Sequence, residues 1–177
     1  MENKMQYSDL INRLKRLDED VSLLYDDDRR INCVIVGGSA LILLHCITRA
    51  THDIDVISCP KEINHLLNKY DFNQQVQTYI NNFPCNFEDR FVKIDVDTKI
   101  MNYYTASLED IVIAKLCSFR DTDHHDITQP SVVDKIDWNL LEVLSVELKD
   151  STLNDRNYTE FKANYDKYIG RHKKCEN

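Results

Sequence analysis

Apolar and polar positions follow helical spacing at the start of the chain and change to strand-like runs soon after. Apolar residues three and four positions apart, with charges between them, predict an amphipathic helix over residues 8–25. A β-branched run predicts a buried strand over residues 31–36, and a nearly continuous apolar segment predicts a buried helix over residues 40–47. The tripeptide Gly37-Gly38-Ser39 stands between them, so the expected order is strand, glycine turn and helix.

The next segment of the chain predicts two strands on either side of a helix. Strands are expected over residues 51–57 and 91–97. A helix that opens with a proline is expected over residues 60–70. Ser107 and Asp110 have the spacing of a capping box, which predicts a helix from residue 107 to about residue 119.

The last third of the chain is helical in period. Helices are expected over residues 131–149 and 158–168, with a turn at 154–157. Because strands come early and helices late, the order predicts an α+β fold with a helical C-terminal part. The expected organisation, packed as one domain, is an N-terminal helix in residues 1–30, a core in residues 31–128 and a helical extension in residues 129–177.

Composition narrows the classes of protein that this chain can represent. The formal net charge of its 177 residues is −8, which argues against a broad basic surface that holds duplex DNA. No window approaches the roughly 18 apolar residues that a membrane span needs, and the polar start does not have the order of a signal peptide, so we expect a cytoplasmic protein. Only three glycines occur and two of them are adjacent, which indicates that their turn needs unusual backbone freedom.

Two aspartates on the second predicted strand form the first candidate site. In Asp53-Ile54-Asp55 the period of two places both carboxylates on one face of the strand. Such a pair can hold Mg²⁺, which takes a few oxygen ligands from protein and leaves room for substrate phosphates. An exposed polar strand face is the alternative interpretation.

The Gly37-Gly38-Ser39 turn is the second candidate. Free backbone N–H groups at the start of a helix favour a phosphate, although a tight turn with close packing explains the glycines equally well. The chain contains neither a Walker A loop nor a dinucleotide-binding glycine fingerprint.

Lys115 is the third candidate, because it completes the apolar stripe of the helix that begins at Ser107. A lysine on a buried face is costly unless it is paired or acts at a site. A phosphate or a metal-bound carboxylate would compensate its charge. The alternative interpretation is a structural lysine, whose aliphatic stem is buried and whose ammonium group reaches the edge of the core.

A cluster of charged residues follows this helix. Asp123 and Asp126 are three positions apart and can share a helical face. His124-His125-Asp126 also suggests a metal phosphohydrolase of the HD type, but the chain offers no convincing set of further metal ligands for that chemistry.

Together these segments resemble a known family. The series Gly37-Gly38-Ser39, Arg49-Ala50-Thr51-His52-Asp53-Ile54-Asp55, Leu108-Glu109-Asp110-Ile111 to Lys115-Leu116, and Arg120 to Ile127 is similar, in order and in gaps, to the motifs of the minimal nucleotidyltransferases related to the AbiEii toxin. The resemblance covers residues 31–128 and depends on four linked motifs rather than on any one of them.

The resemblance implies a DNA polymerase β-like nucleotidyltransferase fold, with a small mixed sheet flanked by helices. By the pattern of the family, Gly37, Gly38 and Ser39 hold the nucleoside triphosphate, and Asp53 and Asp55 bind Mg²⁺ or Mn²⁺. Lys115 would contact phosphate, and Asp126, with or without Asp123, would complete the catalytic set. Arg49 and Thr51 would support the strand that carries the metal ligands or contact the nucleotide. The third metal carboxylate is open between Asp95, Asp97, Asp123 and Asp126.

The function that the resemblance implies is transfer of a nucleoside monophosphate from an NTP, such as ATP, to an acceptor hydroxyl. The acceptor would be a tRNA 3′ end or a protein, and growth inhibition would be restrained by a partner antitoxin. The alternative from another class is a non-catalytic nucleotide-binding or antitoxin-like module on the same fold. The carboxylates at positions 53 and 55 are present, which favours the enzyme.

Overall fold

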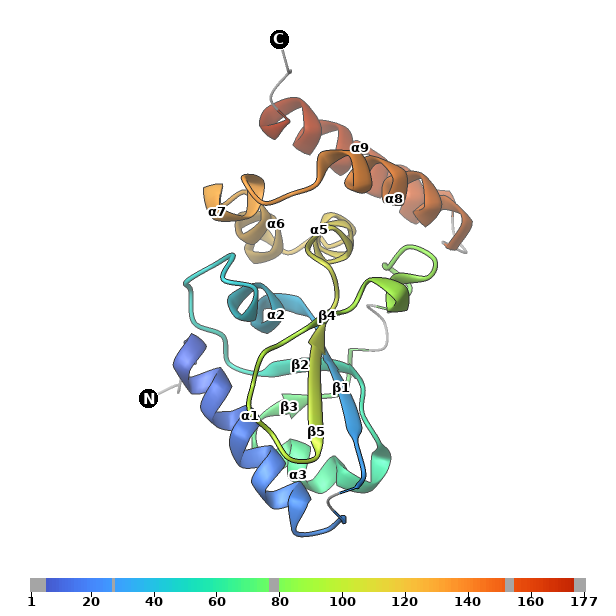
Figure 1. The fold of residues 1–177 in the computed structure, drawn as a ribbon. Helices are drawn as coiled ribbons and strands as arrows, with labels where there is room; N and C mark the ends of the chain where they lie inside the picture. Colours follow the sequence, from blue (N-terminus) through green and yellow to red (C-terminus); the bar gives the residue numbers. More distant parts are fainter. Residues whose placement is uncertain (1–5, 27, 77–79, 152–154, 174–177) are drawn as a thin grey trace.

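The computed structural model describes residues 6–26, 28–76, 80–151 and 155–173 (Figure 1). Its α-helices are α1 (Tyr7–Ser22), α2 (Gly37–Leu43), α3 (Asn64–Lys69), α5 (Leu108–Leu116), α6 (Asp121–Ile127), α7 (Pro130–Val133), α8 (Trp138–Ser151) and α9 (Asp155–His172). Its strands are β1 (Ile31–Ile35), β2 (Ile54–Ser58), β3 (Phe72–Asn73), β4 (Val92–Lys93) and β5 (Met101–Thr105), and its 3₁₀ turns are η1 (Lys61–Ile63) and η2 (Phe87–Arg90).

The strands form a mixed sheet in the order β3-β2-β1-β5-β4. The central strand β1 is parallel to β5 and antiparallel to β2. Its end at Ile35 therefore lies beside Thr105 at the end of β5 and beside Val56 in the middle of β2. This edge of the sheet is the one from which the glycine turn leaves. The predicted α+β class is confirmed.

Helix α1 is attached to the sheet by a buried carboxylate. Asp18, which is 4% exposed, accepts hydrogen bonds of 2.8 Å from the backbone N–H groups of Lys99, Ile100 and Met101. The hydroxyl of Tyr103 donates to the carbonyl of Leu14 at 2.7 Å. Because both contacts end on β5 or just before it, α1 fixes the position of this strand beside β1.

The helices of the second half gather beyond the edge of the sheet where β1 and β5 end (Figure 1). Helix α9 contacts the ends of two of them. Asn164 Nδ2 donates to the carbonyl of Leu116 at 2.9 Å, and the hydroxyl of Tyr168 donates to the carbonyl of Ile127 at 2.7 Å. These carbonyls lie at the C-termini of α5 and α6, where helix backbones have free acceptors. The division at residues 30 and 128 stays a prediction.

The helix after the glycine turn is shifted from its expected position. It begins at Gly37 rather than at residue 40, and it ends at Leu43 rather than at residue 47. His45 has a φ of +55°, Cys46 N–H donates to Leu41 O at 2.8 Å, and His45 N–H donates to Ile42 O at 2.9 Å. This is a Schellman motif with a histidine where glycine is usual, so the sequence gives no local signal for it.

Several other predicted boundaries were wrong. Strands β3 and β5 were not predicted, and of residues 91–97 only Val92 and Lys93 are in a strand. The helix from Ser107 ends at Leu116, and Phe119, which was placed on its apolar stripe, is 78% exposed. Residues 60–70 are divided between η1 and α3, and residues 131–149 between α7 and α8. Of the expected turn at 154–157, Asn154 lies outside the described residues and the rest is helical.

The described part of the chain contains no helix with the length and apolar character that crossing a membrane requires.

Candidate functional site

The glycine turn packs directly against two of the predicted site residues. Gly37 has a φ of +68°, and a Cβ atom at this position would lie 2.8 Å from Asp55 Oδ2. A Cβ atom on Gly38 would lie 2.9 Å from a guanidinium nitrogen of Arg49. The two glycines therefore allow the main chain to approach a carboxylate and a cation where a larger residue would collide with them.

Asp55 lies on β2, and Asp53 lies just before this strand rather than on it. Ile54 and Val56 are buried, as the alternation predicted. Asn73 Nδ2, on the neighbouring strand β3, donates to Asp55 Oδ1 at 2.9 Å. Among the described residues the Asp53 carboxylate has no hydrogen-bond or ion-pair partner. The Asp53 carboxylate and the second oxygen of Asp55, Oδ2, are thus the atoms of this pair that are left to bind a ligand.

The environment of Asp55 disfavours its charged form. Burial raises the pKa of Asp55, the negative charge of Asp53 raises it further, and the hydrogen bond from Asn73 offsets part of this effect. Two carboxylates that repel each other in a partly buried place are a donor set that a divalent cation stabilises. The residues at positions 53 and 55 therefore fit Mg²⁺ chemically.

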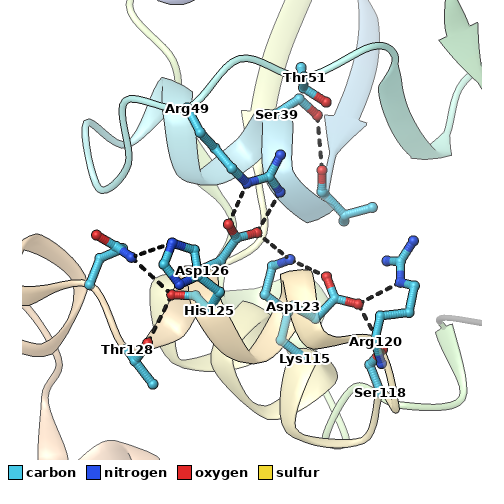
Figure 2. A network of polar contacts seen from close by, with 12 residues as sticks. Ser39, Arg49, Thr51, Lys115, Ser118, Arg120, Asp123, His125, Asp126 and Thr128 are labelled. Carbon is cyan, nitrogen blue, oxygen red and sulfur yellow. Dashed lines mark hydrogen bonds and ion pairs between the residues drawn. The ribbon is translucent and has the colours of Figure 1, made fainter.

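Lys115 lies between two carboxylates (Figure 2). Its Nζ atom is 2.5 Å from Asp123 Oδ1 and 2.9 Å from Asp126 Oδ2, and the lysine residue is 5% exposed. The buried lysine that the helical spacing indicated is therefore present, and α6 supplies its compensating charge. Asp123 and Asp126 lie on the same face of α6, as their spacing predicted.

Arg49 joins this group from the loop that precedes β2. Its guanidinium makes a bidentate ion pair with Asp126, with Nη2 at 2.6 Å from Oδ2 and Nε bonded to Oδ1 (Figure 2). Burial raises the pKa of Asp126, but the hydrogen bonds from Arg49 and Lys115 and the charge of Lys115 outweigh it, and the pKa is lowered overall. Asp126 is therefore held as an anion.

Asp123 is fixed in the same way at the other end of the group. Ser118 Oγ and Arg120 Nε each lie 2.7 Å from Asp123 Oδ2. Burial raises the pKa of this carboxyl, yet Lys115, Ser118 and Arg120 together lower it below the ordinary value. The five side chains Arg49, Asp126, Lys115, Asp123 and Arg120 form a row of alternating charge, which we call the charge row.

A pocket brings the glycine turn, the carboxylate of β2 and the charge row together. Its lining includes Gly37, Asp55, Lys115, Arg120 and Asp123. The apolar part of the wall comes from Val36, Phe83, Ile111 and Ala114. We call this the candidate nucleotide pocket, because residues from all four sequence motifs meet in it.

Asp95 and Asp97 are not brought to this pocket. Both are exposed and follow β4, which runs antiparallel to β5. Val92 pairs with Thr105 near the pocket, whereas Thr98 Oγ1 bonds Met101 O at the opposite end of β5. The two aspartates therefore lie toward the far end of the sheet from Asp55.

Ser39 and Thr51 bond to nearby backbone carbonyls. Ser39 is 1% exposed, and its Oγ donates to Val36 O at 3.0 Å. Thr51 Oγ1 donates to Asp53 O at 3.2 Å. Both hydroxyls therefore stabilise the loops that carry Gly37 and Asp53.

The histidines of α6 do not form a metal site. His124 Nε2 contacts Ser118 O at 2.8 Å, and His125 Nε2 contacts the Gln129 amide at 3.0 Å. In the described ranges no group of three or more histidine, cysteine or acidic side chains is arranged to hold a metal ion. The metal phosphohydrolase alternative gains no support from this arrangement.

Two polar residues of the site, Asn73 and Ser118, were not predicted from the sequence, and neither was the apolar wall residue Phe83. Asn73 holds Asp55 from a strand of two residues, which is too short to show a pattern. Ser118 lies just beyond the end of α5 and bonds Asp123. Arg120 stood within one of the four motifs, but its contact with Asp123 could be suspected only from their spacing of three.

Comparison with known proteins identifies the family of the chain. No curated protein and no solved structure is similar enough to count as a match. Residues 12–173, which include every residue of the candidate nucleotide pocket, match a family described as "Nucleotidyltransferase of unknown function (DUF6036)". The chain therefore belongs to this nucleotidyltransferase family.

Proposed function

We propose that the chain is a Mg²⁺-dependent enzyme that transfers a nucleoside monophosphate from an NTP to a hydroxyl of a tRNA 3′ end or of a protein. The observation that carries this proposal is the approach of Gly37 to the Asp55 carboxylate in a pocket that Lys115 also lines. Mn²⁺ could replace Mg²⁺ on the same ligands. The strand order and the helices around the sheet are compatible with a polymerase β-like fold.

In the proposed reaction the acceptor oxygen bonds to the α-phosphorus of the NTP. The bond from this phosphorus to the bridging oxygen of the β-phosphate breaks, pyrophosphate leaves with the electron pair of that bond, and the hydroxyl proton passes to solvent. Asp53 and Asp55 would hold the metal, which supplies positive charge against the triphosphate. The backbone at Gly37 and Gly38 would lie against the phosphates at the start of α2.

The charge row would provide a fixed electrostatic wall. Lys115 and Arg120 line the pocket, so their positive charge is already oriented before a triphosphate binds. The carboxylates at positions 123 and 126 are saturated by cations, which leaves Asp53 and Asp55 as the carboxylates available to a metal. In this assignment Asp126 orients Arg49 and Lys115 rather than binding metal.

The physiological role that fits the resemblance to AbiEii-related enzymes is that of a toxin-like transferase with a cognate antitoxin. The competing role is a binding module that holds a nucleotide without turning it over. Lys115 already forms ion pairs with two carboxylates, Asp123 and Asp126. This pairing is the observation that favours the second role.

A labelling screen separates the two roles. Purified protein with Mg²⁺ and each of the four α-labelled NTPs is expected to label bulk tRNA or a cellular protein, and Asp53→Ala is expected to reduce labelling by at least about a hundredfold. Asp95→Ala, which removes an exposed carboxylate outside the pocket, is the matched control and should label normally. Equal labelling by the wild type and Asp53→Ala would contradict the proposal that the chain is a transferase. The absence of any labelling by the wild type, with every NTP and both kinds of acceptor, would also contradict it.

A further inference from the structure

A polar groove lies on the other side of α6 from the charge row. It is formed between α6 and α9, and its lining includes His124 and Thr128 from the α6 side and Lys167, Arg171 and His172 from α9. Asp123 and Asp126 face Lys115, whereas His124 and Thr128 face the groove. The groove and the candidate nucleotide pocket are therefore separated by one helix, about 10 Å across.

The α9 wall of this groove is cationic in a chain of net charge −8. Lys167 and Arg171 are four positions apart, so their side chains project from the same face of α9 about 5–6 Å apart at Cβ. Both are exposed, and among the described residues neither has a hydrogen-bond or ion-pair partner. By contrast, Lys173 just beyond α9 is paired with Glu142.

The remaining polar groups of the groove are largely engaged in holding the fold. Asn164 bonds the end of α5, Tyr168 bonds the end of α6, and His124 contacts the carbonyl of Ser118. Asp121 also lines the groove and adds one negative charge on the α6 side. The groups free to bind a ligand are thus the two cations of α9, with His172 beside them.

We infer that this groove binds phosphate groups of an RNA acceptor, and that Lys167 and Arg171 are the residues that contact them. Two cations at helical spacing suit successive phosphates of one strand, and the groove lies on the other side of α6 from the candidate nucleotide pocket. RNA carries a negative charge at every nucleotide, which matches two neighbouring cations, whereas a protein acceptor carries such charge only in acidic segments. The inference rests on the proposed function and chooses RNA from its two acceptor classes.

The test measures RNA binding without turnover. The probe is a fluorescein-labelled RNA hairpin with a single-stranded 3′ end, and binding to the full chain is followed by anisotropy over a range of salt concentrations. Lys167→Ala/Arg171→Ala is expected to bind about tenfold more weakly or worse, with a salt slope smaller by about 1.4, or about 0.7 for each lost contact on a single strand. Both positions are exposed and helical, where alanine is well tolerated.

The matched control is Lys15→Ala/Arg16→Ala, which removes the same two charges from exposed positions of α1. This control is expected to bind RNA like the wild type. Equal affinities of the two double variants, or no RNA binding by the wild type, would overturn the inference. Stabilisation by Mg²⁺ and NTP is measured on the same samples. If Mg²⁺ and NTP stabilise the wild type but the wild type does not bind RNA, only the inference about the groove fails. If Mg²⁺ and NTP do not stabilise the wild type, the proposed function fails.

Discussion

At the scale of single residues, the half-buried Asp55 differs from the buried carboxylates Asp123 and Asp126 of the same site. Asp123 and Asp126 are held by cations that lower their pKa values, whereas burial and the charge of Asp53 raise the pKa of Asp55. A residue whose ionised form is disfavoured in the folded protein lowers the stability of that protein at a pH where the residue is ionised. At Asp55 this cost falls on a residue that lines the candidate nucleotide pocket.

This difference predicts that Asp55→Asn stabilises the protein in the absence of metal. The asparagine Oδ1 can still accept from Asn73, and the charge that burial disfavours is removed. The pKa of Asp55 is higher in the folded than in the unfolded protein, so the wild type loses stability as the pH rises from the unfolded pKa through the folded one. The stability gained by Asp55→Asn should therefore be absent below about pH 3.9 and complete at neutral pH. Urea unfolding at about pH 3.5 and about pH 7 checks this prediction on either side of the unfolded pKa, and a variant destabilised at neutral pH would contradict it.

At the scale of elements, the link between β1 and α2 sets the geometry of the pocket. The positive φ of Gly37 and its distance to Asp55 explain why a chain with three glycines places two of them here. Gly170, in the last turn of α9, has no heavy atom within 4 Å of the position that a Cβ atom would take, and it has no comparable requirement. Gly37 and Gly170 therefore form a natural pair for comparison.

We expect Gly37→Ala and Gly170→Ala to change stability in opposite directions. The first should lower the free energy of unfolding by about 1–2 kcal/mol for the left-handed backbone, and further because its Cβ would overlap Asp55. The second should raise it by about 0.5–1 kcal/mol, since alanine favours the helix. Thermal or urea unfolding measures both, and a Gly37→Ala protein as stable as the wild type would refute the close approach.

The accuracy of the sequence predictions also differs between elements. Local signals were sufficient for α1, for β1 and for the start of α5, where Ser107 accepts from the N–H of Asp110 at 3.1 Å. They failed for β5, because its polar Asn102 and Tyr104 mask the pattern and its position depends on β1, β4 and Asp18. Most polar residues of the site were named, Asn73 and Ser118 excepted, but the pairing of Arg49 with Asp126, 77 positions apart, could not be read from spacing.

At the scale of the whole molecule, two sites lie on opposite faces of α6. The candidate nucleotide pocket is lined by the end of the sheet, α5 and α6, and the groove is lined by α6 and α9. The helical C-terminal segment is therefore part of the proposed function rather than a separate addition. Its contacts with the ends of α5 and α6 keep the groove aligned with the pocket.

The measurement that tests the central claim most directly is stabilisation by an NTP with and without Mg²⁺, compared between wild type, Asp55→Asn and Asp97→Asn. A ligand at about 100 times its Kd stabilises the native protein by about 2.7 kcal/mol, which a thermal unfolding experiment detects. We predict that the wild type and Asp97→Asn are stabilised only when Mg²⁺ accompanies the NTP, and that Asp55→Asn is not stabilised relative to its own unliganded state. Equal Mg²⁺-dependent stabilisation of Asp55→Asn and wild type would contradict the assignment of the pocket.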